Sequence, residues 1–98
     1  MKPVAYLLAA TAEMERSVVW YEKREKGLGV RFHAALKEAE AFISKNPRLG
    51  TRYRRDTRKW RVPEFPYSLI YREERNRILV CAVAHAKRRP DYWLRRVR

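Results

Sequence analysis

The apolar and polar positions of the N-terminal segment alternate, as they do in a half-buried strand. Residues 2–9 therefore predict a short first strand, with one face made by Val4, Tyr6 and Leu8. Thr11 follows this strand as a candidate N-cap for a helix. Glu13 and Glu15 would then lie near the positive end of that helix, where carboxylates are favoured.

A helical period replaces the alternation in the next segment and predicts two amphipathic helices. The apolar stripe of the first helix is Met14, Val18 and Tyr21. The second helix spans about residues 30–44, and its stripe is Phe32, Leu36, Ala39 and Ile43. Gly27 is suited to a left-handed cap between the two helices, and Asn46-Pro47 ends the second one.

The remainder of the chain is rich in strand patterns. Residues 58–62 alternate, so Trp60 and Val62 face one side while Lys59 and Arg61 face the other. Further strands are predicted over residues 67–72 and 77–84, and the second of these is apolar on both faces, as a central strand would be. Residues 91–96 are expected to add a last helical turn. The order β-α-α-β-β-β predicts an α+β fold, with a helical hairpin packed on a mostly antiparallel four-stranded sheet.

Length and charge refine this picture. Ninety-eight residues predict a single domain over residues 1–98, and 46% hydrophobic content is ordinary for a globular protein. Residues 1–46 hold eight Lys or Arg against six Asp or Glu, a balance of +2, whereas residues 47–98 hold sixteen against five, a balance of +11. This asymmetry favours a partner that is rich in phosphate or in acidic side chains.

Several classes of site are not supported by the pattern. Cys81 is the only cysteine and lies in an apolar run, so neither a disulfide framework nor a CxxC metal pair is expected. The chain has no phosphate-binding glycine loop, and we expect no metal site and no cofactor. No signal peptide or membrane span is expected, because the apolar run near the N-terminus is too short. These features favour a cytoplasmic protein.

The candidate functional residues gather in the second half. Arg61 and Lys59 share a strand face and could form a phosphate track, or could simply protect an edge strand from aggregation. His85 is either a structural hydrogen-bonding residue or a general acid or base. The other candidates are cations that could clamp phosphate and a tyrosine that could stack on a base or donate a proton: Lys87, Arg88, Arg89 and Tyr92.

Four segments occur in order along the chain: WYEKREKGLGVRF, NPRLG, RKWRVPEFPYSLIY and AVAHAKRRPDYWLRR. In this combination the chain resembles the ParE/RelE superfamily of bacterial type II toxins over essentially its whole length. The resemblance implies the β-α-α-β-β-β fold and a cognate antitoxin whose acidic C-terminal segment wraps the toxin. It implies two alternative targets. RelE-like members cut mRNA in the ribosome, whereas ParE-like members poison DNA gyrase.

The resemblance also assigns roles to single positions. Lys59 and Arg61 match basic positions of the RelE strand, Arg88 or Arg89 could match its later arginine, and Tyr92 its C-terminal tyrosine. The RelE arginine that follows the tyrosine of the middle strand falls on Ser68, and this removes a phosphate clamp that RNA cleavage needs.

The ending HxxRxP is similar to that of ParE-like and plasmid-stabilisation members. A gyrase poison is therefore the first hypothesis. A ribosome-dependent mRNA endonuclease using His85, Arg61, Arg88 and Tyr92 is the alternative. A family member without toxicity, kept as a DNA-bound regulator or a relic, is the third.

Overall fold

The computed structural model describes residues 1–97. Its elements follow one another as β1 (Val4–Tyr6), α1 (Leu8–Arg24), α2 (Leu28–Lys45), β2 (Thr51–Arg52), β3 (Arg58–Arg61), β4 (Tyr67–Glu73), β5 (Ile78–His85) and the 3-10 turn η1 (Leu94–Arg96). The predicted α+β class and the order of the longer elements are confirmed.

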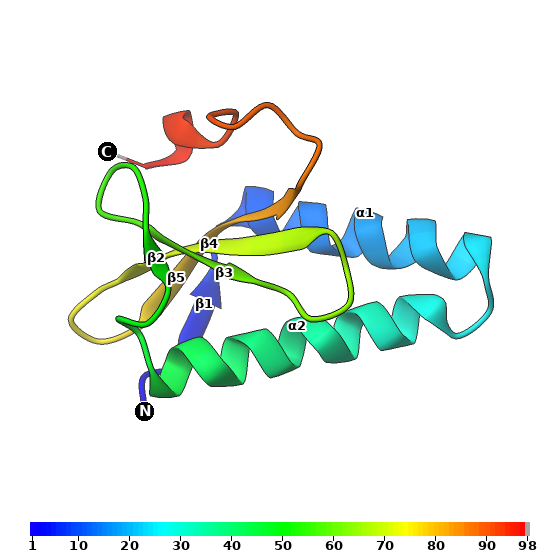
Figure 1. Ribbon diagram of the computed structural model, residues 1–98, viewed down its shortest axis with the longest axis horizontal. Helices are drawn as coiled ribbons and strands as arrows, with labels where there is room; N and C mark the ends of the chain where they lie inside the picture. Colours follow the sequence, from blue (N-terminus) through cyan, green and yellow to red (C-terminus); the bar gives the residue numbers. More distant parts are fainter. Residues whose placement is uncertain (98) are drawn as a thin grey trace.

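The strands form one mixed sheet in the order β1-β5-β4-β3-β2 (Figure 1). β1 runs parallel to β5, with Val4 opposite Ile78, and the other neighbours are antiparallel. The central place predicted for the strand over residues 77–84 is confirmed, because β5 lies between β1 and β4. The expectation of four strands is wrong by one. β2 has only two residues, which is too short to produce a period in the sequence.

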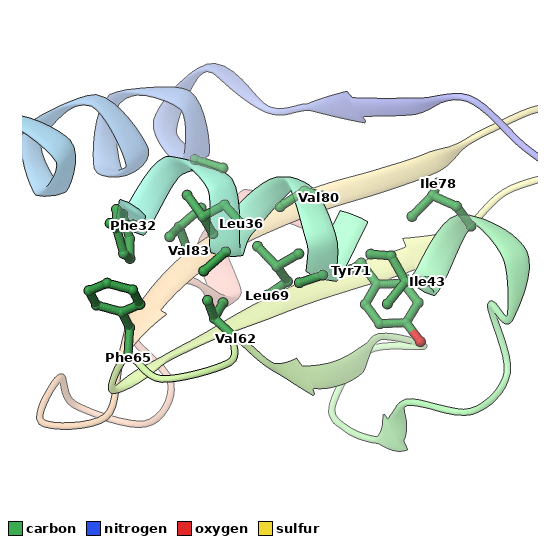
Figure 2. Close-up of a cluster of buried hydrophobic side chains, with 13 residues drawn as sticks. Phe32, Leu36, Ile43, Val62, Phe65, Leu69, Tyr71, Ile78, Val80 and Val83 are labelled. Atoms are coloured by element: carbon green, nitrogen blue, oxygen red, sulfur yellow. The ribbon is translucent and has the colours of Figure 1, made fainter. Parts of the chain in front are cut away.

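The two helices cover one face of the sheet and bury the larger core against it. Figure 2 shows α2 side chains pointing at side chains of β4, β5 and the segment between β3 and β4. The fully buried members of this core include Phe32, Leu36, Ile43, Val62, Leu69, Tyr71, Ile78 and Val80. The apolar stripe predicted for the second helix is therefore the stripe that packs on the sheet.

The C-terminal segment, residues 90–97, covers part of the opposite face. In Figure 1 this segment, orange to red, lies on the side of the sheet away from α2. Trp93 is fully buried there and packs with Ile70, Cys81, Ala82 and Val97 in a second, smaller cluster. The last helical turn predicted over residues 91–96 is present as η1 at Leu94–Arg96.

A β-bulge in β5 changes which face its side chains reach. Ile70 pairs with Ala82 and Tyr71 pairs with Val80, so Cys81 is the extra residue. Because one inserted residue reverses the alternation, Val80 and Val83 both face the helices, although they are three positions apart. Leu79, Cys81 and Val83 are evenly spaced in the sequence but do not share one face, because Leu79 and Cys81 pack in the second cluster whereas Val83 packs against the helices.

The N-terminal boundaries also differ from the prediction. β1 ends at Tyr6, and α1 begins at Leu8, with Leu7 as an N-cap that makes no side-chain capping bond. Thr11 is thus inside the helix and does not cap it. Leu8 is 89% exposed instead of lying on the predicted strand face. The first turn of α1 holds no acidic residue, and Glu13 is buried in the second turn.

The helical hairpin depends on two glycines and one carboxylate. Gly27 has φ +89°, the left-handed conformation predicted for it, and directly precedes α2. Gly29 lies in the first turn of α2 against α1, where a Cβ atom would be 2.5 Å from the carbonyl oxygen of Val18. The Glu22 carboxylate accepts from the amides of Gly27 at 2.8 Å and Gly29 at 2.9 Å. It therefore satisfies free N–H groups at the start of α2.

Candidate functional site

A hollow of about 530 Å³ opens on the sheet face away from the helices. We call it the cationic groove. Cations line it from two places, β3 and the turn that follows β5. Its lining residues are Thr51, Tyr53, Lys59, Arg61, Ser68, Ile70, Ala84, His85, Ala86, Arg88, Arg89, Pro90 and Tyr92. None of these is acidic, so the groove presents one sign of charge and is suited to an anionic ligand.

The alternation of β3 explains why two cations enter the groove. Lys59 and Arg61 are exposed, whereas Trp60 between them points to the helices and stacks on Phe42 at 4.1 Å between ring centres. The Lys59 ammonium nitrogen lies 5.1 Å from the ring centre of Tyr53. The faces predicted for Lys59, Trp60 and Arg61 are therefore confirmed. Tyr53 was not predicted, because it follows the two-residue strand that the sequence pattern did not reveal.

Small side chains separate the two groups of cations. Ser68 on β4 pairs with Arg61 on one side and with Ala84 on the other. Ser68 is only 9% exposed, and both Ser68 and Ala84 line the groove. The position to which the resemblance assigns the RelE arginine is thus neutral in this chain and lies between the two groups of cations.

His85 lies at the end of β5, where the groove meets the turn. Its Nδ1 accepts a hydrogen bond from the backbone amide of Lys87 at 2.9 Å, and its ring lies edge-on to Tyr67. With Nδ1 accepting, the neutral ring carries its proton on Nε2. In this arrangement the imidazole offers a donor and not a free base. Lys87 itself is exposed and, unlike its two neighbours, does not line the groove.

The hydroxyl and the ring of Tyr92 make contacts with two different charged side chains. Its hydroxyl donates to Glu13 Oε2 at 2.6 Å. Burial and this bond to a carboxylate raise the pKa of Tyr92 well above its usual value. The guanidinium carbon of Arg88 lies 3.8 Å from the centre of the Tyr92 ring. The Tyr92 hydroxyl is therefore occupied by its bond to Glu13, and the face of the ring binds the Arg88 guanidinium.

Glu13 also belongs to this region, although the sequence predicted it only as a carboxylate near the start of a helix. It is 5% exposed, and its carboxylate accepts from the Val83 amide at 3.0 Å and from both terminal nitrogens of Arg96 at 2.9 and 3.0 Å. Burial acts to raise the pKa of Glu13, but the bonds from Arg96, Tyr92 and Val83 together hold it below the usual range. Glu13 lies three positions from Ala10, which is also buried, so both lie on the face of α1 that is turned to the sheet.

A second hollow of about 510 Å³ lies between α1 and the strands. Trp20 borders it and is 51% exposed, and the neighbouring Val19 is 52% exposed. Arg24 covers part of the Trp20 ring, with its guanidinium carbon 4.2 Å from the ring centre. His85 and Arg88 line this hollow as well as the cationic groove, so the two hollows meet at the turn after β5.

The structure thus brings together six of the seven predicted site residues: Lys59, Arg61, His85, Arg88, Arg89 and Tyr92. Trp60 and Trp93 are turned away from the groove. Trp60 packs on α2, and Trp93 is buried, with its indole N–H donating to the Pro90 carbonyl at 3.1 Å. Within residues 1–97 no cluster of three or more His, Cys, Asp or Glu side chains could hold a metal ion.

Comparison with known proteins supplies the family. The model of the ParE toxin of the type II toxin-antitoxin system parDE matches residues 4–90. The chain belongs to this family. A structure titled "Chromosomal ParDE TA system from P. aeruginosa" is similar with a TM-score of 0.73 and 14% identity, covering 87% of this chain and 96% of that one. No curated protein matches. This ParE-family chain is therefore the toxin of a type II toxin–antitoxin system, and its ParE-like fold is confirmed.

No helix in the described part of the ParE-family chain has the length and apolar content needed to cross a membrane.

Proposed function

We propose that this toxin inhibits growth by binding DNA gyrase through the cationic groove, without cutting nucleic acid. The proposal rests on the contrast between the cations of the groove, which are available to a ligand, and its histidine and tyrosine, which are already hydrogen-bonded. Four cations line the groove, and together they would hold phosphate. Yet the His85 Nδ1 accepts from its own turn and the Tyr92 hydroxyl is bonded to Glu13. The groove could therefore bind an anion, but it has neither a free base nor a free phenol.

The direct test is a supercoiling and cleavage-complex assay with purified gyrase and toxin. Wild-type protein is expected to inhibit supercoiling and to accumulate cleaved DNA. Replacing Arg61 and Arg88 together by alanine removes one cation from each side of the groove and is expected to abolish both effects. Arg75→Ala is the matched control, because Arg75 is exposed in the turn between β4 and β5, away from the groove. Wild-type protein without effect on gyrase at any dose would refute the proposal.

The second candidate is a ribosome-dependent mRNA endonuclease. It is favoured by the fact that Arg61, His85, Arg88 and Tyr92 line one hollow. Cleavage needs a group that takes a proton from the 2′-hydroxyl and charge that stabilises the transition state. Ser68 supplies no such charge. Primer extension on translated mRNA after toxin induction separates the two functions: we expect intact message during growth arrest, whereas cuts in the A-site codon would establish the nuclease.

Neutralisation is proposed to involve an acidic segment of the cognate antitoxin. The basic half of the chain, with a balance of +11, and the exposed pair Val19 and Trp20 would suit an acidic amphipathic segment. The proposed targets place the protein in the cytoplasm. Co-expression with the product of an adjacent small acidic gene should restore growth. If deletion of that gene leaves toxicity unchanged, its product is not the antitoxin.

A further inference from the structure

We infer that Glu13 positions Arg88 in the cationic groove, acting through the ring of Tyr92. Glu13 itself does not line the groove. The inference rests on the proposed function, because it takes Arg88 as a contact to phosphate. It adds a positioning residue on α1 to a site that otherwise consists of strand and turn residues.

The first step is the place of Glu13 at the edge of the sheet. β1 ends at Tyr6, opposite Val80, so the edge of β5 beyond Val80 has no neighbouring strand. Glu13 from α1 occupies this edge and accepts from the Val83 amide. Its carboxylate is therefore fixed by the main chain of β5. It is also close enough to the opposite face of the sheet to bond the C-terminal segment.

The second step is the bond to the C-terminal segment. Glu13 Oε2 accepts from the Tyr92 hydroxyl at 2.6 Å and from Arg96 at 3.0 Å. Arg96 also donates to the Cys81 carbonyl at 3.1 Å, at the bulge of β5. Bonds to an ionised acceptor are stronger than neutral ones and hold direction as well as distance. The Tyr92 ring is thus fixed relative to the sheet.

The third step is the contact of that ring with Arg88. An exposed arginine side chain has several free rotors and loses entropy whenever it is held in one place. The face of the Tyr92 ring, 3.8 Å from the guanidinium carbon, attracts the cation and selects one position. Arg89 has no comparable ring contact in the described part of the chain. Arg88 is therefore held in one position before a ligand binds, whereas Arg89 is not. This difference depends on Glu13, because Glu13 fixes the Tyr92 ring.

A purely structural Glu13 would affect all groove contacts alike, so a double-mutant cycle separates the two roles. The probe is a short fluorescent single-stranded oligothymidylate, titrated against the full-length toxin. Arg88→Ala is expected to weaken binding by about fivefold, as expected for one exposed ionic contact. Glu13→Gln should weaken binding by a similar factor, although it makes the protein more basic. The double variant should bind no more weakly than either single variant.

Arg89→Ala provides the matched control. Because Arg89 does not depend on Glu13, the loss of affinity in the Arg89→Ala, Glu13→Gln double variant should be the product of the two single losses. Tyr92→Leu provides a second route if Glu13→Gln does not fold. It removes the ring, leaves the Glu13–Arg96 pair in place, and should reproduce the Arg88→Ala loss. In NMR spectra the ring current of Tyr92 should shift the Arg88 Hδ protons upfield, and this shift should diminish in folded Glu13→Gln and vanish in Tyr92→Leu.

The outcomes distinguish the inference from the proposed function. If Arg88→Ala leaves both oligothymidylate binding and gyrase inhibition unchanged, the groove is not the binding surface and both ideas fail. If Arg88→Ala weakens binding but its effect multiplies with that of Glu13→Gln, only the positioning role is overturned. An unchanged Arg88 shift in Glu13→Gln would overturn it as well. Non-additivity with Arg88, together with additivity with Arg89, supports it.

Discussion

The buried carboxylate of Glu13 should make the stability of this toxin depend on pH in a way that one substitution can isolate. Removing one partner of a buried ion pair typically costs about 3–5 kcal/mol. Glu13→Gln keeps an acceptor oxygen for the Val83 amide but loses the charge opposite Arg96. We therefore expect a loss near the lower end, about 3 kcal/mol at pH 7. A domain of this size has about 5–15 kcal/mol in total, so the variant should remain folded.

The pH dependence follows from the direction of the pKa shift. The pKa of Glu13 is lower in the folded protein than its usual value, because the bonds from Arg96, Tyr92 and Val83 outweigh burial. The unfolded chain titrates near the reference value of about 4.3. The contribution of the charge is therefore complete above about pH 5 and is lost as the pH falls through the folded-state pKa. The stability gap between wild type and Glu13→Gln should narrow over the same acid range.

Urea unfolding between pH 3 and pH 8, followed by tryptophan fluorescence, measures this gap. Glu38→Gln is the control, since Glu38 is exposed on α2 and the substitution changes the charge equally. Carboxylates common to all three proteins cancel in the comparison. A gap below about 1 kcal/mol at pH 7, or a gap that stays constant on acidification, would show that Glu13 is not held as an ionised, bonded group.

Three further substitutions or probes test the rest of the structure. Gly29→Ala places a Cβ 2.5 Å from the backbone oxygen of Val18 and should lower the Tm by about 5–15 °C in calorimetry, whereas an unchanged Tm would mean that the helices do not approach this closely. Trp60→Ala removes the stack on Phe42 and should cost about 2 kcal/mol in urea unfolding while leaving oligothymidylate binding unchanged; weakened binding would place Trp60 on the groove face after all. Burial raises the pKa of Cys81 to about 11, so a disulfide reagent at pH 8 should modify this thiol only at the rate of unfolding, and rapid modification of the native protein would contradict its burial.

The sequence was sufficient for the elements that are long enough to show a period. The stripe from Phe32 to Ile43 and the alternation around Trp60 both reflect burial of one face, and both match the structure. β2 was missed, because two residues cannot establish an alternation. Thr11 was a reasonable N-cap by residue type, but the N-cap is Leu7, four residues earlier and directly after β1. Tertiary pairing of Leu7 with Val80 decides that boundary.

The site was predictable in composition but not in geometry. The cations of β3 and of the turn after β5 were identified as one cluster, because charge is visible in a sequence. The bulge at Cys81 was not visible, and it reverses the alternation of the β5 residues that follow it. Glu13 was interpreted as a carboxylate near the positive end of a helix, with no partner assigned to it. Its partners lie at Val83, Tyr92 and Arg96, and no local pattern relates positions so far apart.

The separation of Glu13 from Arg96, 83 positions along the chain, also bears on the order in which the toxin can be assembled. The parallel pairing of β1 with β5 likewise joins the beginning of the domain to residues beyond position 77. Contacts of such long range form late and make folding slow. During translation, a nascent chain that has not yet released Arg96 from the ribosome cannot close this bond. The groove proposed to bind gyrase therefore takes its final form only after residue 96 has left the ribosome.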